Sequence, residues 1–465
     1  MSPFTRDTVR PVSALPAELL ACPRCAHALE RHGQSWRCTS CGTGFPALDG
    51  IPWLFAEPAA SLGEWRDRLH RLLLELQRHA DEIRAELEAP ELLTSTRSRL
   101  KLLAQAWSDH ARRLQSLLAP LSLDAKQAGL EMQLALRTRL PPSQDLASYY
   151  VNLHRDWVWG DAENRASHEL VARAIGDQPL GRMLVLGAGA CRLAYDLHRS
   201  HQPSCTVATD INPLLLLAAA RVLAGKSVAL YEFPIAPRGI DDHAILRQLA
   251  APEPAGPDFH LVFADALRGP FAAEAFDTVL TPWFIDILPV DLADLAPRIN
   301  RMLMPGGRWI AFGSLAFAQR EAAQNYSLPE ALEVIGRAGF QSGATHEAAV
   351  PYMASPASRH ARVESVIAFA ATKIAQMPPP REHAALPAWI VESRIPVPLL
   401  PDFQMAAMST RIQAFLMSLI DGKRTLNEMA EVLVAQRLMS AEEAPAAVRT
   451  FLIRMYEDSR ASRGR

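Results

Sequence analysis

A glycine-rich turn and an acid beyond it are the residues of this chain whose types and spacing first suggest chemistry. An apolar run over residues 183–186 ends in Gly187-Ala188-Gly189, and a second apolar run ends at Asp210. Glycines let a backbone approach a ligand closely, and a carboxylate at the tip of the next strand accepts hydrogen bonds from a ribose diol. The pattern predicts a strand, a turn, a helix and a second strand that together bind a nucleoside.

The glycine turn lacks the features of a phosphate site. The third glycine of a dinucleotide-binding turn is replaced by Arg192, and the lysine and hydroxyl of a P-loop are absent. S-adenosylmethionine carries no phosphate, but it needs a close-approach turn for its amino-acid end and acids for its ribose and adenine. Asp210 suits the ribose, and Asp265, followed by Ala266, suits the adenine amino group. The sequence therefore favours S-adenosylmethionine as the cofactor; for either acid, an ordinary strand-end or turn carboxylate is the alternative.

Asp286 is the candidate catalytic residue. It follows Pro282, Trp283 and Phe284 at the end of a predicted strand, on the edge where open α/β sheets bind ligands. Methyl transfer is an in-line displacement at a sulfonium carbon, and a nitrogen nucleophile must afterwards lose a proton. A carboxylate beside the nucleophile can orient it and accept that proton. A helix-capping role for Asp286 is the alternative.

The scaffold that would position these residues is an alternation of strand and helix patterns. Strand candidates are 183–187, 205–210, 260–264, 277–284, 309–314 and 364–371. Such alternation predicts an α/β fold with a doubly wound, mostly parallel sheet. The long, proline-rich interval 228–259 is predicted to be an insertion.

Four of the six cysteines are spaced as Cys22-x-x-Cys25 and Cys38-x-x-Cys41. Two such pairs supply four thiolates that can close a tetrahedron around zinc. Glycines and prolines over the next residues are typical of the turns of a small β-ribbon. Disulfides or buried reduced thiols are the alternative, and the lack of a secretory signal favours structural zinc.

Composition shifts divide the chain into five expected segments. Apolar residues at helical spacing predict a helix hairpin that packs on the rest of the chain, with a partner-binding coiled coil as the alternative. The expected segments are the zinc ribbon 16–56, the helical region 61–140, the catalytic domain 141–375, a proline-rich linker 376–402 and a helical module 403–458.

The charge balance argues against two classes of partner. With 48 basic and 50 acidic residues the formal net charge is -2, so no overall field favours nucleic acid or an anionic membrane. The local cluster Arg24, Arg31 and Arg37 is the one feature that favours a nucleic-acid acceptor. The amino terminus has no apolar core of a signal peptide, and the longest apolar run, 214–220, is too short to span a bilayer. We expect a cytoplasmic protein.

Residues 303–310 (Leu-Met-Pro-Gly-Gly-Arg-Trp-Ile), together with the glycine turn and the two acids, resemble the class I methyltransferases. In that superfamily the Pro-Gly-Gly turn precedes the fifth strand. The resemblance implies a seven-stranded class I methyltransferase sheet. A narrower resemblance starts at 153–165, where Arg155-Asp-Trp157 looks like the segment before the catalytic domain of the carnosine N-methyltransferase family. It continues collinearly to residue 375.

The narrower resemblance implies roles for further residues. In that family the arginine of the triplet and the polar residue three before it reach the methionine end of the cofactor, which implies Arg155 and Asn152 here. Asn152 departs from the family, which usually has glutamine. The catalytic aspartate of the family falls on Asp286. The expected cofactor contacts are Asn152, Arg155, Gly187, Ala188, Gly189, Arg192, Asp210, Asp265, Ala266 and Pro282.

The acceptor half departs from the family pattern. Ala318 stands where the family has a histidine that holds its imidazole substrate. The tyrosine cluster before the last strand is absent, and His360, Arg362 and Glu364 lie there instead. Carnosine itself is therefore not the expected substrate.

Two further resemblances lie outside the catalytic domain. Residues 38–54 look like the zinc ribbons of small activator subunits of tRNA and protein methyltransferases. Residues 421–433 resemble the Asp-Gly-x-x-Thr-Leu-x-Glu-Ile-Ala pattern of PqqD-like, winged-helix peptide-recognition domains, although Thr425 and Glu428 also form an ordinary helix-capping box. The second resemblance implies a peptide or protein partner at the C-terminal module.

The expected activity is S-adenosylmethionine-dependent methylation of a nitrogen, which can be an imidazole, on a small molecule or peptide. One alternative is a methyltransferase of ribosomal peptides whose C-terminal module binds a leader. Another is a regulator that binds S-adenosylmethionine without turnover.

Overall fold

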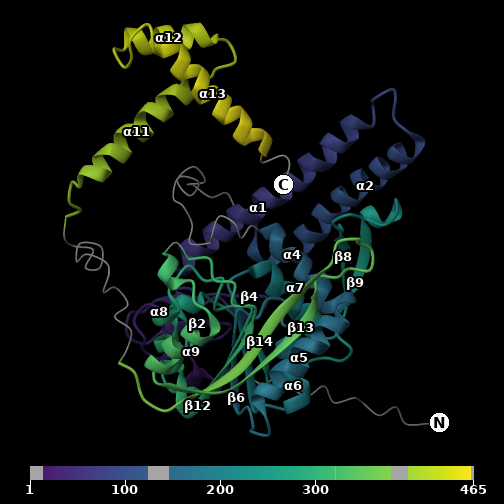
Figure 1. Ribbon diagram of the computed structural model, residues 1–465, viewed down its shortest axis with the longest axis vertical. Coiled ribbons are helices and arrows are strands. Elements are labelled where there is room, and N and C mark those ends of the chain that lie inside the picture. Colours follow the sequence, from purple (N-terminus) through teal and green to yellow (C-terminus); the bar gives the residue numbers. More distant parts are fainter. Residues whose placement is uncertain (1–13, 124–145, 320, 379–395, 462–465) are drawn as a thin grey trace. The chain divides into compact units, whose positions relative to one another are not determined.

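The computed structural model describes residues 14–123, 146–319, 321–378 and 396–461. The chain forms two compact units, Met1–Pro380 and Arg381–Arg465. The first contains the β-ribbon, the helix hairpin and the large sheet, and the second contains the C-terminal helices (Figure 1).

The centre of the first unit is a seven-stranded sheet in the order β10-β7-β6-β11-β12-β14-β13. Its strands are β6 (Arg182–Leu186), β7 (Cys205–Asp210), β10 (Phe259–Phe263), β11 (Phe276–Pro282), β12 (Leu303–Gly313), β13 (Phe340–Tyr352) and β14 (Arg362–Lys373). All neighbours pair in parallel except β14, which is antiparallel to both β12 and β13. Because the strand order reverses between β6 and β11, their carboxyl ends flank a topological switch point, where such sheets bind ligands.

Both faces of the sheet are buried, as the near-continuous apolar strands predict. Along β6, Met183 and Val185 belong to one core cluster, and Leu184 and Leu186 belong to the other. The helices around the sheet are α4 (Leu146–His154), α5 (Asp161–Ile175), α6 (Arg192–His201), α7 (Pro213–Leu223), α8 (Leu292–Met302) and α9 (Leu328–Arg337). Helices α8 and α9 cover one face, and α5 and α6 cover the other (Figure 1).

The predicted insertion contains a hairpin of β8 (Val228–Glu232) and β9 (Ile245–Leu249). The hairpin packs on the helices that precede the sheet: the Tyr150 hydroxyl donates to the Tyr231 carbonyl at 2.6 Å, and Trp107 stacks on Phe233 with centroids 3.7 Å apart.

The helix hairpin consists of α1 (Pro58–Glu86) and α2 (Thr94–Leu117). Helix α1 begins three residues before the expected helical region, and α2 lies within it. Residues 124–140 of that region lie outside the described residues. Trp65 and Leu69 of α1 and Leu114 of α2 are buried in the core cluster that covers one face of the sheet. The hairpin therefore packs against the catalytic sheet.

The amino-terminal ribbon has a three-stranded part, β1 (Leu29–His32), β2 (Ser35–Cys38) and β3 (Gly44–Phe45), followed by the pair β4 (Ala47–Leu48) and β5 (Ile51–Pro52). Leu29, Trp36 and Phe45 are buried in the same cluster as α8 and α9. The three-stranded part is thus in the core on this face of the sheet, whereas Leu48, Ile51 and Trp53 belong to the cluster of the other face.

The second unit contains α11 (Pro401–Ser418), α12 (Leu426–Ala435) and α13 (Ala444–Ala461). Thr425 and Glu428 form the expected capping box at the start of α12. Residues 396–461 contain these three helices and no strand, and the resemblance to winged-helix domains stays a prediction. Among the described residues, no helix is both long and apolar enough to cross a membrane.

Candidate active site

A cavity of about 780 Å³ opens at the carboxyl ends of β6, β7 and β11. Its volume lies within the range of pockets that enclose a small-molecule ligand. Every site residue predicted for cofactor binding or catalysis lines it: Asn152, Arg155, Gly187, Ala188, Gly189, Arg192, Asp210, Asp265, Ala266, Pro282 and Asp286.

The glycine turn has two glycines with different surroundings. Gly187 has φ +67°, and a Cβ atom there would lie 2.3 Å from Cδ2 of Phe284, so no side chain fits. Gly189 has φ +56°, and a Cβ atom there would meet no atom within 4 Å. The first glycine thus lets the turn pack on Phe284, whereas the second exposes backbone to the cavity.

Asp210 holds the turn and faces the cavity. Its carboxylate accepts the Gly189 N–H through Oδ2 and the Asn212 N–H through Oδ1, both at 2.8 Å. Burial raises the pKa of Asp210, and the N–H groups of Asn212, Gly189 and Ile211 oppose that rise. A carboxylate oxygen accepts more than one hydrogen bond, so each oxygen can also accept from a ribose hydroxyl.

Asp265 caps the short helix η5 (Ala266–Arg268). Its Oδ1 accepts the Leu267 N–H at 2.9 Å. The structure therefore shows the turn role that the sequence allowed as an alternative. The same residue and Ala266 line the cavity next to Ala264, at the carboxyl end of β10.

Arg155 begins a π-helical turn, η3 (Arg155–Trp159), directly after α4. Its Nε donates to Asp156 Oδ1 at 2.7 Å, and its Nη1 lies 3.5 Å from Glu163 Oε1. Single π turns are frequent at functional sites, because they redirect side chains without ending the helix. The two acids hold the largely buried guanidinium at the cavity wall, three residues after Asn152.

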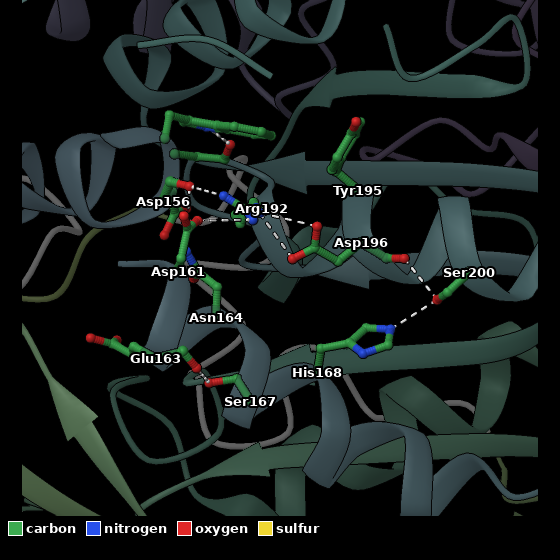
Figure 2. A network of polar contacts seen from close by, with 12 residues as sticks. Asp156, Asp161, Glu163, Asn164, Ser167, His168, Arg192, Tyr195, Asp196 and Ser200 are labelled. Atoms are coloured by element: carbon green, nitrogen blue, oxygen red, sulfur yellow. Dashed lines mark hydrogen bonds and ion pairs between the residues drawn. The ribbon is translucent and has the colours of Figure 1, made fainter. Parts of the chain in front are cut away.

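Arg192, at the start of α6, anchors the turn to the preceding helices (Figure 2). Its Nε donates to Asp196 at 2.9 Å, its Nη1 donates to the Asp156 carbonyl at 2.6 Å, and its Nη2 lies 3.4 Å from Asp161 Oδ1. The guanidinium also lies 5.5 Å above the Trp157 ring. Arg192 lines the cavity, but most of its hydrogen-bonding capacity is used within the protein.

Asp286 lies buried in the cavity wall beyond β11. Its Oδ2 accepts the Ala316 N–H at 2.7 Å, and burial raises its pKa. Trp283, three residues earlier, has φ +49°, a left-handed conformation that costs energy for a bulky residue. Its ring lies 5.0 Å from that of Tyr352. The strained turn therefore places the aromatic ring of Trp283 and the carboxylate of Asp286 in the wall of the same cavity.

Several lining residues were not predicted as site residues. Arg362 lies 4.4 Å above the Tyr352 ring and 2.8 Å from Glu364. Burial raises the pKa of Tyr149 to about 12, with further contributions from Asp210, Tyr352 and Asp286. The unpredicted polar and aromatic residues of the cavity wall include Trp65, Tyr149, Glu163, Tyr352, Arg362 and Glu364. Among these residues, only Arg362 and Glu364 stood out in the sequence, because they lie where the carnosine N-methyltransferase family has its tyrosine cluster.

The four cysteines of the ribbon converge as the spacing predicts. Their sulfur atoms lie within 4.8 Å of one another, with Cys22 and Cys41 at 3.7 Å and Cys25 and Cys38 at 3.4 Å. A zinc tetrahedron with bonds of about 2.3 Å has sulfur–sulfur edges of about 3.8 Å. The Ser40 and Cys41 N–H groups donate to Cys38 Sγ, both at 3.4 Å. The cluster therefore fits a metal ion.

The order of the sheet strands, counted along the chain, is 3-2-1-4-5-7-6 with only the seventh strand antiparallel. This is the α/β sheet of the class I S-adenosylmethionine-dependent methyltransferases.

No family model matches the chain, and no curated protein matches it. Among solved structures, a putative methyltransferase from Bacillus halodurans is 13% identical over 45% of this chain and 100% of that chain, with a TM-score of 0.32. The N-methyltransferase NodS from Bradyrhizobium japonicum, in complex with S-adenosyl-l-homocysteine, is 14% identical over 48% and 98%, with a TM-score of 0.32. A chain of the complex between the Haloferax volcanii Trm112 methyltransferase activator and the putative methyltransferase is 13% identical over 50% and 98%, with a TM-score of 0.34.

Proposed function

We propose that this protein is an S-adenosylmethionine-dependent N-methyltransferase. The observation that carries the proposal is the cavity at the switch point of the sheet, which is lined by Asp210, Asp286 and a glycine turn without the features of a phosphate site. The turn and Asp210 suit the amino-acid end and ribose of the cofactor. Asp286 follows β11, the other strand of the switch point, where the acceptor would lie.

Each cofactor group has a matching part of the wall. Asp210 would accept the ribose hydroxyls, Asp265 and Ala266 would hold the adenine, and Asn152 and Arg155 would bind the amino-acid end. Arg155 carries the only charge of this set that matches the cofactor carboxylate, and Glu163 and Asp156 hold it in place. Arg192 would support the cofactor site indirectly, because its contacts within the protein hold the start of α6 in place.

Methyl transfer moves positive charge from the cofactor sulfur to the acceptor nitrogen. The carbon–sulfur bond breaks as the nitrogen–carbon bond forms, and sulfur keeps the electron pair of the bond that breaks. A carboxylate next to the nitrogen stabilises the transition state more than the ground state, because the charge there develops during the reaction. Asp286 supplies that carboxylate, and it can then accept the proton that the methylated nitrogen loses.

The acceptor side of the cavity has the chemistry to bind an amine or an imidazole. Tyr149, Trp283 and Tyr352 present aromatic rings, and aromatic faces attract the positive charge of a methylated nitrogen. The Arg362–Glu364 ion pair at the same wall can contact polar groups further along the acceptor. We therefore propose a nitrogen on a small molecule or on a peptide side chain as the acceptor.

The cysteine cluster is proposed to hold a structural zinc ion through Cys22, Cys25, Cys38 and Cys41. Burial raises the pKa of the Cys22 thiol to about 12, and Thr43 lowers that of Cys41 to about 6. A bound dication favours the thiolate form of all four groups. Zinc would close the ribbon and would take no part in methyl transfer.

Calorimetry and mass spectrometry test the proposal. The wild type should bind S-adenosylhomocysteine, and Asp286→Asn should bind it with unchanged affinity, because the Asn oxygen still accepts the Ala316 N–H. With deuterium-labelled cofactor, cell extract incubated with the wild type should yield a labelled nitrogen compound, and Asp286→Asn should not. No binding of S-adenosylhomocysteine by the wild type would contradict the proposal, and cofactor binding without any labelled product would favour a regulatory protein.

A further inference from the structure

The loop that carries Asp265 is hydrogen-bonded to the ribbon on both of its sides. On one side the Leu54 N–H donates to the Phe263 carbonyl at 2.9 Å, next to a parallel bridge between Trp53 and Phe263. On the other side the Ala21 N–H donates to the Pro270 carbonyl at 2.9 Å, beside an antiparallel bridge between Leu20 and Phe271. Residues 264–269 therefore lie between two strand-like junctions.

Both junctions are buried. Trp53 and Leu54 have no exposed surface, and Leu20 and Phe271 are exposed by 2% and 1%. The Trp53 ring lies 5.3 Å from that of Phe263. Because backbone hydrogen bonds inside a packed core have no water to replace their partners, separating the junctions would leave donors unsatisfied. The ribbon thus restrains the loop strongly.

A third contact links the ribbon to another part of the cavity wall. Trp53 Nε1 donates to Ser61 Oγ at 2.9 Å, at the start of α1. One turn further along, Trp65 of α1 lines the cavity. The same ribbon residue therefore contacts the strand before the cofactor loop and the helix that supplies an aromatic wall.

Both junctions directly adjoin the cysteine cluster or the strands that it closes. At the first junction, Cys22 directly follows Ala21. At the second junction, the chain runs from the second cysteine pair, which lies between β2 and β3, through β4 and β5 to Trp53. Small metal sites supply folding energy to the segment that holds their ligands, so the metal helps to define where both junctions lie.

We propose that the ribbon is a metal-dependent positioning element for the adenine end of the cofactor site. Metal in the cysteine cluster holds the two junctions, the junctions hold residues 264–269, and these residues present Asp265 and Ala266 to the cofactor. This inference rests on the proposed cofactor. Because coupling between two binding sites is reciprocal, the cofactor must also tighten metal binding.

Calorimetry on full-length protein, with zinc and after removal of zinc by a chelator, tests the inference. We expect zinc removal to weaken S-adenosylhomocysteine binding by about tenfold, within the usual range of coupling between sites. Hydrogen exchange should rise at residues 264–272, while β6 and β11 keep their protection. Circular dichroism and exchange of the central strands show that the sheet remains folded.

A variant that leaves all four thiols intact separates positioning from unfolding of the ribbon. Leu54→Pro removes the N–H that donates to Phe263 and should weaken cofactor binding while one zinc ion per chain is retained. Glu30→Ala, at an exposed position on β1, is the matched control and should change neither quantity.

Equal cofactor affinity with and without zinc, or wild-type affinity in zinc-loaded Leu54→Pro, would overturn the inference and leave the proposed function intact. Failure of the zinc-loaded wild type to bind S-adenosylhomocysteine would instead contradict the proposed function. The two outcomes can be told apart, because the first is an equality between two measurable cofactor affinities and the second is the absence of any cofactor binding.

Discussion

The two glycines of the turn should respond differently to the same substitution. Gly187→Ala adds a methyl group 2.3 Å from the buried Phe284 ring at a residue with φ +67°. The left-handed backbone costs about 1–2 kcal/mol for alanine, and overpacking a core costs about 1–3 kcal/mol. We therefore expect Gly187→Ala to lower the free energy of unfolding by about 2–5 kcal/mol. Urea titration followed by tryptophan fluorescence measures this change.

Gly189→Ala is the matched comparison. Its backbone strain is similar at φ +56°, but its methyl group meets no protein atom within 4 Å, and Gly189 lines the cavity. We expect a loss of stability of only about 1–2 kcal/mol. Its affinity for S-adenosylhomocysteine should fall by about tenfold or more, or ~1.4 kcal/mol, because the methyl group occupies cofactor space. The effect of alanine on the unfolded chain is common to both variants, so it cancels in the comparison. Equal stability of the two variants, or wild-type cofactor affinity in Gly189→Ala, would refute this account of the turn.

Three further predictions concern the charged residues of the site. Burial raises the pKa of Asp286 in the folded state, so ionising this carboxyl opposes folding once the pH exceeds the pKa of the unfolded chain. Asp286→Asn should therefore unfold at a higher temperature than the wild type at neutral pH and lose that advantage in acid. Scanning calorimetry across pH measures this difference, and a variant less stable than the wild type at neutral pH would contradict the prediction. For the wild type, the acidic limb of the kcat/KM profile should lie above the ordinary carboxyl range, since the base must be ionised; a limb at the ordinary pKa would assign the step to another group. Arg192→Ala should lower the free energy of unfolding by about 2 kcal/mol, as measured by urea titration. It should weaken cofactor binding less than Arg155→Ala does, as measured by calorimetry. A larger loss of cofactor affinity in Arg192→Ala than in Arg155→Ala would give Arg192 a direct role in binding.

The parallel strands and the residues at their tips could be predicted from sequence because their signal is local. Strands buried on both faces appear as short apolar runs, and ligands bind at their carboxyl ends, so Gly187, Asp210 and Asp286 followed directly. Strand β13 was missed, because most of its side chains are at least partly exposed at the sheet edge and it has no apolar run. The resemblance of the C-terminal module to winged-helix domains stays a prediction, since a capping box marks any helix start and does not determine what precedes or follows it.

Tertiary placement explains the residues that sequence reasoning missed. Trp65 belongs to an amphipathic helix, and its pattern shows only that one face is buried. Tyr352 reaches the cavity because Glu163, on α5, accepts the Met353 N–H at 2.8 Å and fixes the turn after β13. That contact joins residues 190 positions apart, so no local pattern encodes it. The ribbon junctions at Phe263 and Pro270 are likewise contacts between distant segments.

The ribbon belongs to the same chain as the sheet on which it packs. A separate subunit leaves its site when the protein is diluted, whereas a tethered segment stays at a high effective concentration whatever the amount of protein. The contacts of Trp53 and Leu54 with the end of β10 therefore form in every copy of the chain, with a fixed one-to-one ratio. Cofactor affinity should consequently be the same at nanomolar and micromolar protein, and the abundance of this protein in a cell should have no influence on whether its cofactor loop is held.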